Sequence, residues 1–286
     1  MEIFITVAVI ALIALMVWNY KRHVGKTVQL TANPYKIKAQ ELCVGEEGSR
    51  IYGRLWLPEG KEGKLPTVIC SHGMHSSHRN TEYNIGKALA MAGFAVYCFD
   101  FRGGSAHSKS QGDPADMSVF TEQNDLNLVM DEIRKLPVVD TENLFLMGES
   151  QGGFVSAITA EQRPEEIKAM VLYYPAFCIP EDARNRYPNI EAIPEKTGEK
   201  ANMMGKAYHE KLSDYDVYEH LAGFEKPVLI IHGDKDDGVK LHYSERAASV
   251  FPDAQLKVLE GQGHGFNPAG VEAAARMTYD FIIKQL

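Results

Sequence analysis

The sequence predicts an α/β fold with a mostly parallel sheet of about eight strands and helices on both faces of the sheet. Short apolar runs typical of buried strands alternate along the chain with segments whose apolar residues recur at helical spacing. Such alternation covers a parallel sheet with helices on both sides. One apolar run passes into a helical segment through Gly148-Glu149-Ser150-Gln151-Gly152, which indicates a sharp strand–turn–helix corner. The length of 286 residues is compatible with one α/β domain.

An uncharged apolar run occupies residues 3–18. Its length is at the lower limit for a helix that crosses a bilayer. A cleaved signal peptide is less favoured, because the chain starts Met-Glu without a positive charge, and so is a buried core helix, because the run is apolar all round. Interfacial aromatic residues and positive charges follow: Trp18, Tyr20, Lys21, Arg22 and Lys26. We therefore expect residues 1–25 to be a single-pass membrane anchor, with the following domain in the cytoplasm.

A polar linker of residues 26–36 precedes a predicted catalytic domain of residues 37–286. Strands and helices alternate in this domain, without an internal repeat or a low-complexity tract. The second strand alternates apolar and polar residues, as a half-buried antiparallel strand does. Strands are expected at residues 37–44, 50–57, 66–73, 94–100, 144–149, 169–174, 227–234 and 255–259. Helices are expected at residues 79–92, 117–136, 241–250 and 269–285, and directly after Ser150.

The net charge of −8 and the lack of a basic stripe argue against a nucleic-acid partner. The four cysteines are widely spaced and form no Cys-x-x-Cys pair. Two of them, Cys70 and Cys98, lie in apolar strand-like runs. We therefore expect buried reduced thiols, not a disulfide framework or a metal site.

Ser150 occupies the corner of a Gly-x-Ser-x-Gly pattern between strand and helix. A serine on a tight, strained turn needs neighbours without side-chain bulk, which Gly148 and Gly152 supply. The start of the following helix directs backbone N–H groups and the positive end of the helix dipole toward the place where an oxyanion would form. The pattern therefore predicts that Ser150 is a nucleophile.

A serine nucleophile needs a base within hydrogen-bond reach and an acid that orients the base. In a parallel sheet, such residues lie in loops after the carboxyl ends of the strands. His264 follows the last strand and is flanked by glycines, so we expect it to be the base. The acid is expected in the segment His-Gly-Asp-Lys-Asp-Asp of residues 232–237, after the preceding strand. Its candidates are Asp234, Asp236 and Asp237.

An oxyanion intermediate needs two backbone N–H donors. One is expected from Gln151, directly after the nucleophile, and the other from Met74, in the loop after the strand at 66–73. Three histidines in this region recur at every third position and raise the question of a zinc site: His72, His75 and His78. No carboxylate or cysteine completes such a site, so we expect no metal, and no organic cofactor is needed.

Together these motifs make residues 37–286 resemble the α/β-hydrolase superfamily, in which nucleophile, acid and base follow in the order Ser, Asp, His. The resemblance assigns Asp236, the second aspartate of His-Gly-Asp-x-Asp, as the acid. Segments such as Met-Ser-Val-Phe-Thr-Glu and Gly-Glu-Ser-Gln-Gly-Gly are similar to those of bacterial cinnamoyl and feruloyl esterases, and similar chains include serine aminopeptidase-like hydrolases. The chain departs from the esterases at Glu149, where histidine is commonest, and at Met74, where an aromatic residue is common.

A long irregular stretch, residues 176–225, separates two of the predicted strands, and it is long for a plain connection. In this superfamily such an insert forms a cap over the active site. Its aromatic and methionine side chains suit an apolar or aromatic acyl group, although they could equally serve to pack the insert on the domain. These residues are Tyr187, Met203, Met204, Tyr208, Tyr215 and Tyr218.

The resemblance implies a serine hydrolase that cleaves small-molecule carboxylic esters, with aromatic or short acyl groups, through an acyl-enzyme intermediate. Ser150 attacks the ester, His264 acts as base and then as acid, and Asp236 orients His264. Two alternatives remain open. One is a serine aminopeptidase or amidase on the same triad, and the other is a catalytically idle hydrolase fold that serves as a membrane-tethered binding module.

Overall fold

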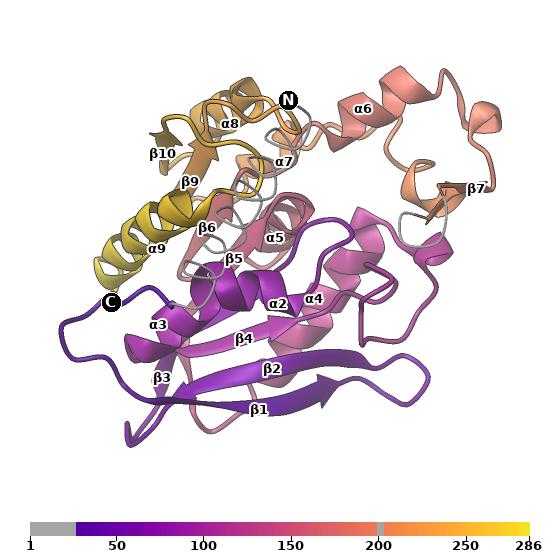
Figure 1. The fold of residues 1–286 in the computed structure, drawn as a ribbon. Coiled ribbons are helices and arrows are strands. Elements are labelled where there is room, and N and C mark those ends of the chain that lie inside the picture. Colours follow the sequence, from indigo (N-terminus) through magenta and orange to yellow (C-terminus); the bar gives the residue numbers. More distant parts are fainter. Residues whose placement is uncertain (1–26, 199–202) are drawn as a thin grey trace, which may run out of the picture.

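The computed structural model describes residues 27–198 and 203–286, which contain an eight-stranded sheet in the order β1-β2-β4-β3-β5-β6-β9-β10 (Figure 1). The strands are β1 (Ile37–Val44), β2 (Ile51–Pro58), β3 (Leu65–Ser71), β4 (Ala95–Phe99), β5 (Val139–Glu149), β6 (Ala169–Tyr173), β9 (Val228–Gly233) and β10 (Ala254–Leu259). β2 is antiparallel to β1 and to β4, whereas every neighbouring pair from β4 to β10 is parallel. The predicted mostly parallel sheet of about eight strands is confirmed.

Helices cover both faces of this sheet (Figure 1). They are α2 (His78–Thr81), η1 (Glu82–Gly86), α3 (Lys87–Met91), α4 (Val119–Ile133), α5 (Gln151–Gln162), η3 (Pro164–Glu166), α8 (Leu241–Val250) and α9 (Pro268–Ile283). Apolar residues of α4, α5 and α8 belong to one buried cluster, and those of α3 and α9 belong to another. Residues of β4 alternate between the two clusters, with Tyr97 and Phe99 in the first and Val96 and Cys98 in the second. The sheet is therefore buried on both sides, as its apolar strands predict.

Helix α4 shows why the observed boundaries differ by a few residues from the predicted ones, here 117–136. The hydroxyl of Ser118 accepts a hydrogen bond from the backbone N–H of Thr121, and the Thr121 hydroxyl accepts one from the N–H of Ser118. This capping box ends the extended chain and starts the helix at Val119. The apolar positions that predicted the helix are buried: Leu126, Val129, Met130 and Ile133.

The insert of residues 176–225 is more regular than the sequence predicts. It holds α6 (Ile179–Arg186), η4 (Ile190–Ala192), the strands β7 (Lys196–Thr197) and β8 (Met204–Gly205), η6 (Lys206–Tyr208) and α7 (Tyr218–Leu221). Figure 1 shows α6 and β7 projecting beyond the sheet. Helix α6 buries only Ile179, Pro180 and Ala183, which is too few apolar positions for a helical period in the sequence.

The expected localisation, at a membrane with a cytoplasmic domain, is corrected by the structure. A bilayer-spanning helix needs about 20 apolar residues. The longest helix within residues 27–198 and 203–286 is α9, with 16 residues, and none of the helices there is long and apolar enough to cross a membrane. The expected anchor, residues 1–25, lies outside the described part of the chain.

Candidate active site

Ser150 lies at the corner between β5 and α5, as the sequence predicts. Its backbone has φ 52° and ψ −117°, a strained conformation that a residue with a side chain rarely adopts. The N–H of Ser150 donates to the carbonyl of Tyr173 in the neighbouring strand β6, at 2.9 Å. This bond to the sheet helps to hold the strained corner in place.

Two glycines make the corner possible. A Cβ atom on Gly148 would lie 2.3 Å from the carbonyl oxygen of Gly152, and a Cβ on Gly152 would lie 2.3 Å from the carbonyl oxygen of Ser71. Both distances are far inside van der Waals contact, so only glycine fits at either position. The close approach brings the end of β3 directly against the corner that carries Ser150.

The structure brings Ser150, His264 and Asp236 together in one chain of hydrogen bonds. The Ser150 hydroxyl lies 3.0 Å from Nε2 of His264, and Nδ1 of His264 lies 2.8 Å from Oδ2 of Asp236. Because the carboxylate can only accept, Nδ1 carries the proton and Nε2 is free to accept from Ser150. The Asp236 side chain is fully buried, whereas that of His264 is 34% exposed and can meet a ligand.

Asp236 is distinguished from the other two candidate acids by its contacts. Its Oδ1 atom accepts from the backbone N–H groups of Gly238 and Val239, at 2.9 and 2.8 Å. Asp234 instead accepts from the N–H of Gly261, and Asp237 forms an exposed ion pair with a lysine. Of the three, Asp236 is the one that contacts His264.

A second histidine, His232, also contacts this carboxylate, and the sequence reasoning missed it. Its Nε2 atom lies 3.2 Å from Oδ2 of Asp236 and 2.9 Å from the carbonyl oxygen of Val239. Because both are acceptors, Nε2 carries a proton, and Nδ1 accepts from the hydroxyl of Ser244 at 2.7 Å. Burial lowers the pKa of His232, which keeps the ring neutral. The signal in the sequence that could have found His232 is its position at the end of β9, four residues before Asp236.

Tyr174 is a second residue that the sequence reasoning missed, and it has no sequence signal. It has φ 36°, and its ring packs 4.7 Å from that of His264 and 4.8 Å from that of Phe266, measured between centroids. The tyrosine is buried and limits the positions that the imidazole can adopt. We count it among the groups that hold His264 in place.

The two expected oxyanion donors belong to the residue after Ser150 and to a loop that packs against Ser150. Gln151 is the first residue of α5, and Met74 follows Gly73, where an added Cβ would lie 3.1 Å from the Cβ of Ser150. The loop turns back sharply, because the N–H of Ser76 donates to the carbonyl of Gly73. Within residues 27–198 and 203–286, neither the Met74 nor the Gln151 backbone N–H has a hydrogen-bond partner. Both are therefore available to a substrate oxygen.

Glu149, the residue before Ser150, forms its hydrogen bond outside the chain of Ser150, His264 and Asp236. It is buried, and its Oε1 atom accepts from the side-chain amide of Asn84 in η1 at 2.8 Å. Burial raises the pKa of Glu149 to about 7. This contact packs the Glu149 side chain against the neighbouring helical segment η1.

The three histidines that raised the question of zinc are held in different ways. Nδ1 of His72 donates to the carbonyl of Gly73, and Nδ1 of His78 lies 2.8 Å from the carboxylate of Asp100. His75 has φ 56° and shapes the turn after Met74. In the described parts of the chain, no cluster of histidine, cysteine or acidic residues is arranged to bind a metal ion.

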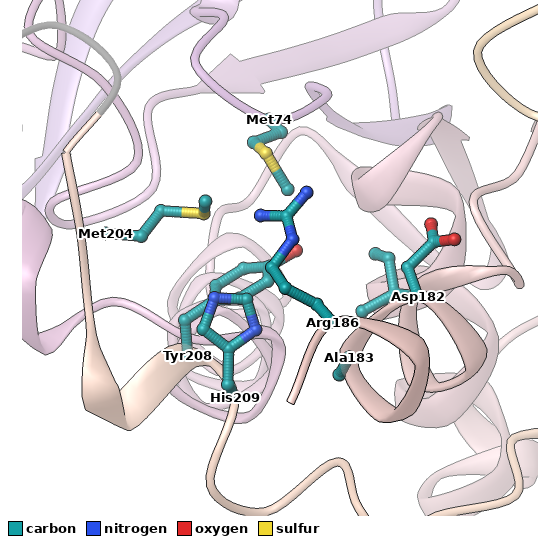
Figure 2. Close-up of a pocket in the computed structure, with 8 residues that line it drawn as sticks. Met74, Asp182, Ala183, Arg186, Met204, Tyr208 and His209 are labelled. Carbon is teal, nitrogen blue, oxygen red and sulfur yellow. The ribbon is translucent and has the colours of Figure 1, made fainter. Parts of the chain in front are cut away.

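A pocket of about 120 Å³ lies between the insert and the Met74 loop (Figure 2). Its lining mixes apolar side chains with charged and aromatic ones: Met74, Ile179, Asp182, Ala183, Arg186, Met204, Tyr208 and His209. Met74 belongs both to this pocket and to the loop beside Ser150, so the pocket adjoins the candidate catalytic residues.

Comparison with known proteins finds hydrolases. Residues 64–214, just over half of the chain, match the family model described as serine aminopeptidase, S33. Monoglyceride lipase of Rattus norvegicus is 28% identical over 149 residues, which are 50% of this chain and 45% of that protein. The chain thus spans less than half the length of this curated relative. Monoacylglycerol lipase of Mycolicibacterium smegmatis is 24% identical over 273 residues, with 79% of this chain and 90% of that protein covered.

Solved structures of hydrolases share the fold of this chain. Est1E from Butyrivibrio proteoclasticus, solved with ferulic acid bound, has a TM-score of 0.77 and 25% identity, and the match covers 85% of this chain and 98% of that one. A monoacylglycerol lipase from Paleococcus ferrophilus shares the fold with a TM-score of 0.63 and 19% identity, over 82% of this chain and 99% of that one. These matches confirm the predicted resemblance to α/β-hydrolases and the expectation of a hydrolase-class enzyme.

Proposed function

The chain belongs to the serine aminopeptidase S33 family of hydrolases, and from this premise we propose that it hydrolyses carboxylic esters through an acyl-enzyme intermediate. The observation that carries the proposal is the chain of hydrogen bonds from Ser150 through His264 to Asp236, at 3.0 and 2.8 Å. Residues 37–286 form the catalytic domain in this proposal, and the insert of residues 176–225 serves as its cap.

In the first half of the reaction, Nε2 of His264 takes the proton of the Ser150 hydroxyl as the oxygen attacks the ester carbonyl. The carbonyl oxygen becomes negative and accepts from the backbone N–H groups of Met74 and Gln151. The tetrahedral intermediate then collapses. The alcohol leaves with the proton from His264, and the acyl group remains bound to Ser150.

In the second half, a water molecule replaces the alcohol. His264 takes a proton from the water as it attacks the acyl-serine, and it returns the proton to Ser150 when the acid leaves. Asp236 holds the Nδ1–H tautomer and stabilises the imidazolium that forms in both halves. The carboxylate keeps its place through the two backbone N–H groups bound to Oδ1. These steps use only groups of the chain and water.

The pocket supports a short or aromatic acyl group. Its volume of about 120 Å³ is small, since pockets for drug-sized ligands measure about 300–1,000 Å³. Apolar side chains form part of its lining, among them Met74, Met204 and Ile179. A structural relative was solved with ferulic acid, an aromatic acid, and sequence relatives are monoacylglycerol lipases.

A peptidase or amidase on the same residues is the second candidate, because the matching family model is described as a serine aminopeptidase. An amine is a worse leaving group than an alcohol, so amide hydrolysis depends more strongly on proton donation by His264. Rates on matched ester and anilide substrates separate the two candidates.

The proposal is tested with p-nitrophenyl acetate and butyrate, methyl ferulate and an aminoacyl p-nitroanilide. We expect ester turnover by the full chain and a loss of at least about 10⁴-fold in kcat for Ser150→Ala. Ser156→Ala is the matched control, because Ser156 is a buried serine of α5 whose hydroxyl has no partner in the described residues. Turnover of the anilide alone would move the assignment to peptidase. A folded chain that turns over none of these substrates, or a fully active Ser150→Ala, would refute the mechanism.

A further inference from the structure

The pocket beneath the insert holds a histidine that the proposed mechanism does not use. His209 is only 5% exposed, yet within the described residues neither of its ring nitrogens has a hydrogen-bond partner. The rings of Tyr187 and Tyr208 pack edge-on against the imidazole, with centroids 4.9 and 5.0 Å away. Buried polar atoms in native proteins are nearly always paired. An imidazole that two tyrosine rings fix in a pocket, with both nitrogens unpaired, therefore points to a ligand.

Arg186 lines the same pocket. It is the last residue of α6, and in residues 27–198 and 203–286 its guanidinium forms no ion pair or hydrogen bond. Asp182, one helical turn earlier, interacts with the thiol of Cys178 instead. Figure 2 shows the guanidinium turned toward Met74, while the carboxylate of Asp182 points away from it. The cation is thus directed into the pocket without an acidic partner.

The two side chains have complementary properties. Arg186 presents a planar group of N–H donors that can bind a carboxylate through two parallel hydrogen bonds. Burial, and then the charge of Arg186, lower the pKa of His209, so the imidazole is neutral near pH 7 and offers one N–H donor. A carboxylate has acceptor sites for both residues. An apolar group would leave the buried His209 unpaired, whereas Arg186 is exposed and would remain in contact with solvent.

We propose that Arg186 and His209 form a subsite for a free carboxylate on the substrate, so that the enzyme prefers esters that carry a second, ionised carboxyl group a few methylenes from the scissile bond. This rests on the proposed function, because the subsite can select esters only if Ser150, which packs against the Met74 loop of this pocket, attacks them. Apolar groups of Met74 and Met204 line the same small pocket and suit the methylenes in between. The carboxylate can belong to the acyl part or to the alcohol part of the ester.

Two pairs of substrates test the proposal and separate these sources. Monoethyl glutarate and ethyl pentanoate differ by a carboxylate on the acyl side, and 4-acetoxybutanoate and butyl acetate differ by one on the alcohol side. For the full chain, we expect kcat/KM for the charged member of one pair to exceed that of its neutral partner by about tenfold or more. The pair that shows the preference identifies the side of the ester that enters the subsite.

The preference should depend on Arg186 and His209. We expect Arg186→Gln to lower the charged-to-neutral ratio by about tenfold or more, and His209→Phe to lower it by a smaller factor. Arg184→Gln is the matched control, because Arg184 lies on the same helix but donates to the carbonyl of Tyr215. Equal rates within both pairs in the wild type overturn the proposal. So does an Arg186→Gln ratio equal to that of Arg184→Gln.

A binding measurement keeps this test separate from that of the proposed function. Glutarate is titrated into the full-chain Ser150→Ala variant by calorimetry, which needs no turnover. We expect binding that weakens by about tenfold or more when Arg186→Gln is added, and not when Arg184→Gln is added. If no ester is hydrolysed but glutarate binds in this way, the proposed function fails and the subsite stands. Absence of binding, or binding insensitive to Arg186→Gln, refutes the subsite.

Discussion

The hydroxyl of Tyr208 donates a hydrogen bond to Oε1 of Gln151 at 2.7 Å. Tyr208 belongs to the insert, whereas Gln151 begins α5 and is the residue whose backbone N–H is proposed to bind the oxyanion. The side-chain amide of Gln151 also donates to Oε2 of Glu122 in α4 at 2.8 Å. All three side chains are buried. One glutamine therefore connects the insert, the corner at Ser150 and helix α4, and glutamine suits this place because it carries both an acceptor and a donor.

We predict that Tyr208→Phe lowers both stability and kcat. The substitution leaves the buried Oε1 atom of Gln151 without a donor, which costs about 1–3 kcal/mol of unfolding free energy. Because the Gln151 N–H remains but is less well held, kcat should fall by less than the roughly 10²–10³-fold that follows removal of an oxyanion donor. Urea unfolding and ester kinetics measure the two effects. Tyr279→Phe, at a half-buried tyrosine of α9, serves as control. Unchanged stability and kcat in Tyr208→Phe would contradict the prediction.

His232→Phe should change the pH dependence of the reaction as well as its rate. In the wild type, the Nε2–H group of His232 lies 3.2 Å from Oδ2 of Asp236 and partly neutralises its charge. Without this group, more of the negative charge of Asp236 acts on His264. That charge favours the imidazolium, so the apparent pKa on the acid side of the kcat/KM profile should rise. His232→Gln retains an N–H donor and should shift the profile less. A purely structural role for His232 would lower the amount of folded enzyme without moving the profile.

Asp236→Asn should be far more damaging than His232→Phe. With an amide in place of the carboxylate, His264 loses both its tautomer preference and the stabilisation of its imidazolium, and a loss of about 10⁴-fold in kcat is expected. Asp237→Asn is the matched control, because Asp237 is exposed and pairs with Lys240. Comparable losses in the two variants would mean that the wrong aspartate has been assigned.

Glu149 makes stability depend on pH. Its pKa is raised by burial to about 7, from about 4.3 in the unfolded chain, so the folded state binds more protons between these values. Unfolding free energy should therefore fall as pH rises through this window, by roughly 3 kcal/mol from this group. Glu149→Gln keeps an acceptor for Asn84 and removes the titration, so its stability should fall less steeply with pH. A slope remains, because burial also raises the pKa of Asp125 to about 6.

Urea unfolding of the wild type and Glu149→Gln at several values between pH about 4.5 and 8 measures the difference. Glu165→Gln, at a side chain that is 92% exposed, shows the effect of removing a surface carboxylate. If Glu149→Gln and the wild type lose stability in parallel as pH rises, the carboxyl of Glu149 does not titrate in this window.

Gly152→Ala tests the close approach at the corner that carries Ser150. The new methyl group would lie 2.3 Å from the carbonyl oxygen of Ser71, so β3 and α5 must separate. We expect a loss of at least about 2 kcal/mol in unfolding free energy. Gly263→Ala is the control for stability, since its Cβ would approach no atom more closely than 3.5 Å. Equal unfolding midpoints for the two variants would show that the corner tolerates the extra atom.

Local patterns in the sequence determined the order of strands and helices, the corner at Ser150 and the loop that carries His264. These features depend on apolar spacing and on glycines within a few residues of each other, so a single stretch of chain contains the whole signal. The choice of Asp236 needed the family resemblance as well, because three aspartates share one loop. The membrane localisation, drawn from residues outside the described part of the chain, is the prediction that the structure corrected.

Beyond the group of Ser150, His264 and Asp236, only the tertiary structure decided which distant residues meet. The contact of Tyr208 with Gln151 joins residues 57 positions apart, and the pocket brings Met74 beside Arg186 and His209. Such contacts depend on how the insert packs against α5 and the Met74 loop, and apolar periodicity carries no information about the partner of a polar side chain. Burial is likewise set by the tertiary structure. It raises the pKa of Glu149 to about 7, and it encloses the unpaired ring nitrogens of His209.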